Sequence, residues 1–173
     1  MLFRSVADGL GFMFQDRGQL FSLRDGHPNL YAPGKRPFQT IIPGFATKNG
    51  QPWMAFGVMG GDMQPMGQQQ IIVNTVDYGL DIQSAGDSPR WHHEGSAQSM
   101  GEDAPGMPPD GLLRLELGVP EKTRAALAGL GWTIGKSDGG FGRYECIEHR
   151  MSGQDRVWAA ASEMRADGCA LAY

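Results

Sequence analysis

Three features that would assign the protein to a specialised class are missing from this sequence. Its two cysteines, Cys146 and Cys169, are too few for the disulfide framework of a small secreted domain. No apolar run approaches the roughly 20 residues that cross a bilayer, and residues 1–20 lack the apolar core of a signal peptide. Lysine and arginine are scattered and the net charge is −4, so we expect no membrane span and no nucleic-acid partner. The compartment, cytoplasmic or periplasmic, is left open.

The common cofactor-binding motifs are also missing. No G-x-G-x-x-G opens a helix, and no Gly-Lys-Ser/Thr follows a glycine-rich turn, so neither a dinucleotide site nor a phosphate loop is predicted. His92, His93 and Glu94 are adjacent, but neighbouring side chains on a strand point to opposite faces, unlike the two histidines of a helical zinc site. We therefore expect no cofactor and no metal, and we interpret this segment as a solvated strand end.

Glycine is, by contrast, abundant: the 173 residues include 26 glycines and 11 prolines. This composition favours many turns and a strand-rich fold with short connections. The length suits one domain with a core, so we expect a single domain over residues 1–173. Within it, the polar, Gly- and Pro-rich stretch 95–111 is expected to form a surface loop.

A strand, a tight glycine turn and a helix are predicted around residue 60. Asn49-Gly50 is typical of a type I′ hairpin turn, which would pair a strand ending near Thr47 with residues 52–59. After the glycine turn, a three- and four-residue spacing predicts a helix, with one face formed by Met66, Gln69, Val73, Val76 and Leu80.

The turn itself contains Gly60 and Gly61, which lack Cβ atoms and can adopt positive φ. At the start of a helix, free backbone N–H groups and the helix dipole favour an anion or a developing oxyanion. The alternative is a tight structural connection, since paired glycines are common in turns. The carboxylate of Asp62 suits a helix N-terminus and argues against a phosphate ligand.

Further elements are predicted on either side of this segment. Upstream, residues 10–23 have the pattern of a hairpin with a polar turn. Downstream, alternation places Leu113, Leu115 and Leu117 on one face of a strand, and Pro120 opens a helix that ends at Gly131. The remaining predicted strands are 132–134, a hairpin of 143–149 with 156–162, and 169–173.

Several short motifs follow one another along nearly the whole chain: Asp16-Arg17-Gly18, His27-Pro28-Asn29, Pro33-Gly34-Lys35-Arg36-Pro37, Gly57-Val58-Met59-Gly60-Gly61-Asp62-Met63-Gln64, Asp77-Tyr78-Gly79, Ser88-Pro89-Arg90-Trp91 and Arg165-Ala166-Asp167-Gly168. In this order they resemble the γ-glutamyltransferase family, and most closely its branch of γ-glutamyltransferase-like acylases. The most specific of them are the lysine-arginine-proline loop, the glycine turn and the Pro-Arg-Trp sequence.

The resemblance implies an α+β chain that forms part of an N-terminal-nucleophile hydrolase, a four-layer αββα sandwich. In this family a precursor cleaves itself and frees an N-terminal threonine, whose own α-amine acts as the base while its hydroxyl attacks an amide carbonyl. By this resemblance, Gly60 and Gly61 supply the amides of the oxyanion hole. The expected substrate is a small γ-glutamyl or related acyl amide, and water or an amino acid then takes the acyl group.

Some positions depart from the family. Every threonine is internal, so we expect the nucleophile strand and the large subunit upstream, with this chain as the C-terminal part of the small subunit in a heterodimer. The resemblance assigns Arg17, Leu20, Gln39 and Thr40 to substrate binding. Gln39 and Thr40 replace paired serines, and Leu20 replaces the aspartate that holds the substrate's ammonium group, which would then lie unpaired. The alternative function is a non-catalytic remnant or binding module.

Overall fold

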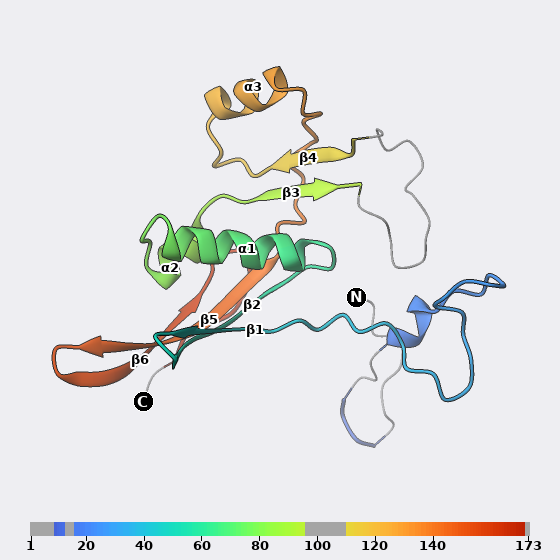
Figure 1. Cartoon of the computed structure of the whole chain (residues 1–173), viewed down its shortest axis with the longest axis horizontal. Helices are drawn as coiled ribbons and strands as arrows, with labels where there is room; N and C mark the ends of the chain where they lie inside the picture. Colours follow the sequence, from blue (N-terminus) through green and yellow to red (C-terminus); the bar gives the residue numbers. More distant parts are fainter. Residues whose placement is uncertain (1–8, 13–15, 96–109, 172–173) are drawn as a thin grey trace. The chain divides into compact units, whose positions relative to one another are not determined.

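A computed structural model of the chain describes residues 9–12, 16–95 and 110–171 (Figure 1). These residues divide into two compact units, one up to Ile41 and one from Ile42 onward. Most of the predicted surface loop 95–111 lies outside the described residues. Among the residues described, no helix combines the length and the apolar character needed to cross a membrane.

The first unit contains one short helix and a set of turns. The 3₁₀-helix η1 covers Arg17–Leu20, and a parallel bridge joins Ser22 to Leu30. The predicted hairpin over residues 10–23 is therefore wrong in its described part, because the amides of Gln19 and Phe21 close local turns instead of pairing across strands. Residues 13–15 of that hairpin lie outside the described residues.

In this unit, the lysine of the lysine-arginine-proline loop forms hydrogen bonds with the backbone just before the loop. The ammonium group of Lys35 donates to the carbonyls of Pro28, at 2.7 Å, and Leu30, at 3.1 Å. The rings of Phe21 and Tyr31 pack edge to face with their centroids 5.5 Å apart. Local polar contacts and one aromatic pair thus hold this loop in place.

The second unit is built on a four-stranded antiparallel sheet, which we call the main sheet. Its strands are β1 (Gly44–Lys48), β2 (Gln51–Met59), β5 (Arg143–Ser152) and β6 (Asp155–Ser162), in the order β1-β2-β5-β6. Asn49 and Gly50 have φ of 53° and 74°, as a type I′ turn requires, so the predicted hairpin is confirmed. The predicted pairing of 143–149 with 156–162 is also confirmed, with β5 and β6 extending to the turn between them.

Two helices cover one face of the main sheet: α1 (Met63–Val76) and α2 (Ile82–Asp87) (Figure 1). The core between them and the sheet contains Met54, Val58, Ile71, Ile82, Tyr144, Cys146 and Ala161. α2 begins at an Asp81 cap, whose carboxylate accepts from the amides of Gln83 at 2.9 Å and Ser84 at 3.0 Å. These hydrogen bonds lower the pKa of Asp81, the bonds from Ser84 contributing most.

The buried face of α1 differs from the predicted one. Its buried residues are Met63, Gly67, Gln70 and Ile71, whereas Val76 is 56% exposed. The reason is close packing: a Cβ atom on Gly67 would lie 2.6 Å from Cγ1 of Val58, so the helix approaches β2 at its smallest residue. Hydrophobic spacing alone missed this face because two of its four residues are not apolar.

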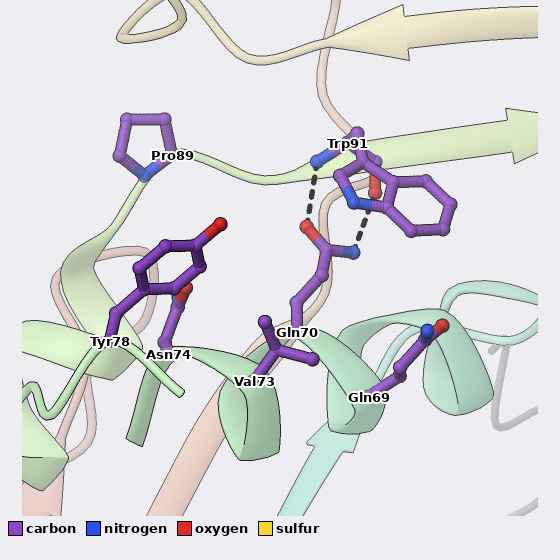
Figure 2. A pocket seen from close by; sticks show the side chains of 7 residues that line it. All are labelled: Gln69, Gln70, Val73, Asn74, Tyr78, Pro89 and Trp91. Atoms are coloured by element: carbon purple, nitrogen blue, oxygen red, sulfur yellow. Dashed lines mark hydrogen bonds between the residues drawn. The ribbon is translucent and has the colours of Figure 1, made fainter. Parts of the chain in front are cut away.

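The side chain of Gln70 is buried and forms two hydrogen bonds with the backbone of a single residue, Trp91 (Figure 2). Its side-chain amide donates to the carbonyl of Trp91 and accepts from the amide of Trp91, both at 2.9 Å. This pair attaches α1 to strand β3 and satisfies both polar ends of the glutamine. A pocket of about 330 Å³ opens beside the pair, between the helix and Pro89.

A second, two-stranded sheet pairs β3 (Trp91–Glu94) with β4 (Leu112–Leu115), and α3 (Glu121–Gly129) follows it. Leu113 and Leu115 share one face of β4, as predicted, and both are buried. Leu117 was predicted on the same face but is 83% exposed, because the strand ends at Leu115. The predicted strand 132–134 is reduced to a single bridge between Ile134 and Leu113. Residues 169–171, predicted as the start of a last strand, have no regular structure, and residues 172 and 173 are outside the described part.

Candidate active site

The glycine turn lies between β2 and α1, immediately before the first residue of the helix. Gly60 and Gly61 have φ of 134° and 62°, in the region that favours glycine. Their carbonyls accept from the amides of Met63, at 3.2 Å, and Gln64, at 3.1 Å, which start the helix. Among the described residues, neither the Gly60 nor the Gly61 amide donates a backbone hydrogen bond. Two adjacent amides are therefore available at a helix N-terminus.

Gly60 is also required by close packing. A Cβ atom on Gly60 would lie 3.0 Å from Cα of Gly142 and 3.3 Å from Cβ of Met63. Gly142 has φ of 77°, and a Cβ atom there would lie 2.6 Å from the carbonyl oxygen of Met59. The segment that enters β5 thus touches the turn through two glycine backbones, which fixes the position of the Gly60 peptide. A Cβ atom added to Gly61, by contrast, would meet no other atom within 4 Å.

A cleft of about 420 Å³ adjoins the turn. It is lined by residues 139–143 and by four further residues: Met59, Gly60, Glu116 and Arg165. Three of the five residues in that segment are glycines, so backbone rather than side chains forms much of the wall. A small substrate can therefore approach the Gly60 peptide closely.

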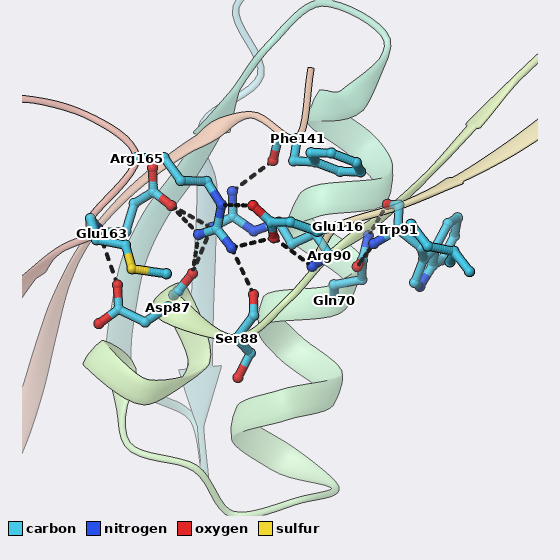
Figure 3. A network of polar contacts seen from close by, with 12 residues as sticks. Gln70, Asp87, Ser88, Arg90, Trp91, Glu116, Phe141, Glu163 and Arg165 are labelled. Atoms are coloured by element: carbon cyan, nitrogen blue, oxygen red, sulfur yellow. Dashed lines mark hydrogen bonds and ion pairs between the residues drawn. The ribbon is translucent and has the colours of Figure 1, made fainter. Parts of the chain in front are cut away.

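A buried ionic network supports the wall of this cleft (Figure 3). Arg90 and Glu163 are each 1% exposed and form an ion pair of 3.3 Å. Arg90 also donates to the carbonyls of Phe141, at 2.8 Å, and Gly86, at 2.9 Å. Burial, and then the nearby Arg165, lower the pKa of Arg90 despite its acidic neighbours. The bond to Phe141 is the link to the site, since the next residue along the chain is the Gly142 that touches the glycine turn.

Arg165 completes the network. Its guanidinium donates to Glu116 through Nε at 2.7 Å and through Nη2, and it also pairs with Glu163. It donates as well to the carbonyls of Gly86, at 2.9 Å, and Ser88, at 3.0 Å. Burial opposes ionisation of Glu116, but hydrogen bonds from Arg165 and from the Arg90 amide hold the pKa of Glu116 below its usual value. All five guanidinium hydrogens of Arg165 are thus engaged.

The other predicted site residues all belong to the first unit. Arg17 and Leu20 are the two ends of η1 and are half-buried, and the Leu20 carbonyl accepts from the side chain of Asn29 at 2.7 Å. Gln39 is exposed, and its side-chain oxygen accepts from the amide of Thr40 at 3.1 Å. Their assignment to substrate binding stays a prediction.

The adjacent histidines lie on opposite faces of β3. His92 is buried, and burial lowers its pKa although the carboxylates of Glu94 and Asp62 oppose that shift. His93 is half-buried, with Nε2 3.0 Å from the carbonyl oxygen of Asp110 and its ring packed edge-on against Trp132. Within the described ranges, no group of three or more His, Cys, Asp or Glu is placed to hold a metal ion.

The mixed sheet-and-helix fold is part of the N-terminal-nucleophile-hydrolase fold of this chain's γ-glutamyltranspeptidase structural neighbours. The chain belongs to the Gamma-glutamyltranspeptidase family, whose sequence model matches residues 4–173.

Among solved structures, cephalosporin acylase from Bacillus halodurans is similar at 38% identity and a TM-score of 0.73, over 94% of this chain and 28% of that one. The W525D mutant of γ-glutamyltranspeptidase from Pseudomonas nitroreducens has 22% identity and a TM-score of 0.74, over 98% of this chain and 85% of that one, which shows the fold alone.

The curated relatives are proenzymes by name. The glutathione hydrolase-like YwrD proenzyme of Bacillus subtilis is 41% identical over 86 residues, or 50% of this chain and 16% of its own length. Acylase ACY 1 proenzyme of Pseudomonas sp. strain V22 is 29% identical over 164 residues, or 95% of this chain and 26% of its own length. The chain therefore spans about a quarter or less of these two relatives.

Proposed function

We propose that this chain is the part of a γ-glutamyltransferase-like amide hydrolase or acyltransferase that supplies the oxyanion hole through the amides of Gly60 and Gly61. The observation that carries this proposal is the pair of positive-φ glycines whose amides donate no backbone hydrogen bond among the described residues. Donors fixed in this way need no rearrangement when an amide carbonyl becomes a tetrahedral oxyanion. The α1 dipole adds to the same stabilisation.

The nucleophile in this proposal is an N-terminal threonine that lies outside these 173 residues. The threonine hydroxyl attacks the amide carbonyl, its own α-amine takes the proton and later gives it to the leaving amine, and the negative charge forms on the carbonyl oxygen beside the glycine turn. Water or an amino acid then attacks the acyl-enzyme. The acceptor that dominates is a property of the complete site.

The partner is the remaining part of the protein, a large subunit and a nucleophile-bearing segment, with residues 1–173 as one domain of the assembly. Support for this partner comes from the face of the main sheet opposite α1, which we call the open face. An in-register row crosses all four strands there, Phe45 to Ala55 to Ile147 to Ala160. Phe45 is 65% and Ile147 51% exposed, so this row leaves an exposed apolar patch that a further layer could cover.

The proposed substrate is a small γ-glutamyl or related acyl amide. Relatives are named glutathione hydrolase, oxamate amidohydrolase and cephalosporin acylase, and an acyl amide suits this set of names. We assign Arg17, Leu20, Gln39 and Thr40 to substrate binding on the family resemblance. Leu20 disfavours an acyl group with a free ammonium, because leucine has no charge with which to pair it.

Gly61→Ala tests the oxyanion hole, with Gly79→Ala as its matched control. The two glycines have φ of 62° and 67°, and a Cβ atom added at either would meet no other atom within 4 Å, so the backbone strain is the same at both ends of α1. We expect Gly61→Ala to lower kcat by up to about 100-fold and Gly79→Ala to leave kcat close to wild type. Equal kcat values for the two variants would refute the role of the turn.

A further inference from the structure

Arg143 lies beside the glycine turn and is not used by the ionic network. It is the first residue of β5, and its Cα is paired with that of Met59, the residue just before Gly60. It is exposed, and it lines the same cleft as Gly60. The side chain therefore emerges next to the peptide that we assign to the oxyanion hole.

The charged side chains that line this cleft differ in whether they have a partner in the protein. Glu116 and Arg165 neutralise each other through two hydrogen bonds, and the remaining donors of Arg165 are bound to Glu163 and to backbone carbonyls. Within the part of the chain that the structure describes, the Arg143 guanidinium has no hydrogen-bond or ion-pair partner. Among the described residues that line the cleft, one positive charge, that of Arg143, therefore lacks a partner, whereas the one carboxylate, that of Glu116, has one.

We propose that Arg143 binds a carboxylate carried by the amide substrate and so sets its specificity. This inference rests on the proposed function, because it takes the scissile carbonyl to lie at Gly60 and Gly61. A guanidinium presents parallel N–H donors that match a carboxylate, which gives charge and orientation together. The carboxylate can belong to the acyl group or to the amine, and the substrates below distinguish these two sources.

Glu145 is the residue that competes with this role. It lies two residues further along β5, on the same face of the strand as Arg143. Its carboxylate accepts from the hydroxyl of Ser162 at 2.8 Å, which occupies one oxygen and directs the group toward β6. Because Ser162 holds this carboxylate, Glu145→Gln should leave the carboxylate preference unchanged. A stronger preference in this variant would show that Arg143 pairs with Glu145 instead of with the substrate.

The test measures kcat/KM of the complete protein on matched anilides. One pair compares glutaryl nitroanilide with its neutral terminal amide, and the other compares an acyl nitroanilide with the same anilide carrying a ring carboxylate. We expect wild type to favour the charged member of one pair by about 10- to 100-fold. Arg143→Gln should abolish that preference, and Arg143→Lys should keep part of it.

Arg150→Ala is the matched control, since it removes the same charge from an exposed position on the same strand, away from the cleft. It should leave both preferences unchanged. An equal preference in wild type and Arg143→Gln would overturn the role of Arg143 while leaving the proposed function intact. A processed wild-type protein that cleaves none of the four anilides would instead refute the proposed function, and this inference with it.

Inhibition of wild type gives a second measurement that needs no variant. Glutarate, a dicarboxylate product, should inhibit cleavage of the charged glutaryl substrate about 10- to 100-fold more strongly than its neutral diamide. The difference should shrink as salt is added, because the contact is between charges. Equal inhibition by the two compounds would exclude recognition of a carboxylate on the acyl group.

Discussion

The two faces of the main sheet come from the same four strands but have opposite surroundings. Val58, Tyr144 and Ala161 are at most 1% exposed beneath the helices, whereas Ile147 and Trp158 on the open face are 51% and 70% exposed. A strand with one face in water usually alternates apolar with polar residues, and a strand buried on both faces is apolar on both. This difference supports the proposal that a further layer covers the open face.

Ile147→Glu, on the open face, should have the largest effect on the protein. A carboxylate in the middle of the open face would be buried without a partner once the second layer covers it, so we expect loss of the assembled protein and of its amidase activity. Leu130→Glu, at a residue that is 79% exposed beyond the end of α3, is the control and should assemble normally. Size-exclusion chromatography of the complete protein measures both. Normal assembly of Ile147→Glu would show that the open face is a solvent surface.

Gly67→Ala probes the covered face. The new Cβ atom would meet Val58 Cγ1 at 2.6 Å, so we expect the free energy of unfolding to fall by about 1–3 kcal/mol. The matched change Gly129→Ala, in α3 with nothing within 4 Å, should instead stabilise by up to about 1 kcal/mol. Urea unfolding measures both. Similar effects of the two changes would mean that α1 does not pack closely on β2.

Substitution of Glu116 should have a smaller, pH-dependent effect on the stability of the fold. Because its pKa in the folded protein is held below the usual 4.5, its ionised form stabilises the fold above that pH, and this contribution is lost as the pH falls through the lower folded-state pKa. Glu116→Gln should be less stable than wild type at neutral pH and should show a weaker loss of stability below pH 4.5. Urea midpoints measured across this range test it, with the exposed Glu121→Gln as control. Parallel pH profiles for wild type and Glu116→Gln would contradict the role of the pair.

Elements with strong local signals were predicted well from the sequence. Asn49-Gly50 determines its own hairpin because both residues adopt positive φ, and the alternation of Tyr144 and Cys146 with exposed neighbours marks β5. The family was recognised from motif order, and the family comparison confirms it. The glycine turn was located correctly between β2 and α1, although its chemical role remains a proposal.

Features that depend on tertiary contacts were not predictable. The buried face of α1 includes Gly67 and Gln70, whose burial depends on Val58 and Trp91 in other elements. The pairing of Arg90 with Glu163 joins residues 73 positions apart in the sequence. The sequence contains the two motifs with Arg90 and Arg165, but nothing in one sequence indicates that these arginines share an acidic partner, Glu163.

The most direct test of the account is an amidase assay with γ-glutamyl nitroanilide and glutaryl nitroanilide. It would be run on this chain alone and on the chain produced together with the remaining part of the protein. We expect activity only in the complete protein, with the glutaryl substrate preferred if Leu20 has replaced the ammonium-binding group. Activity of the chain alone would contradict an external nucleophile, and a processed but inert complete protein would identify a non-catalytic remnant of the family.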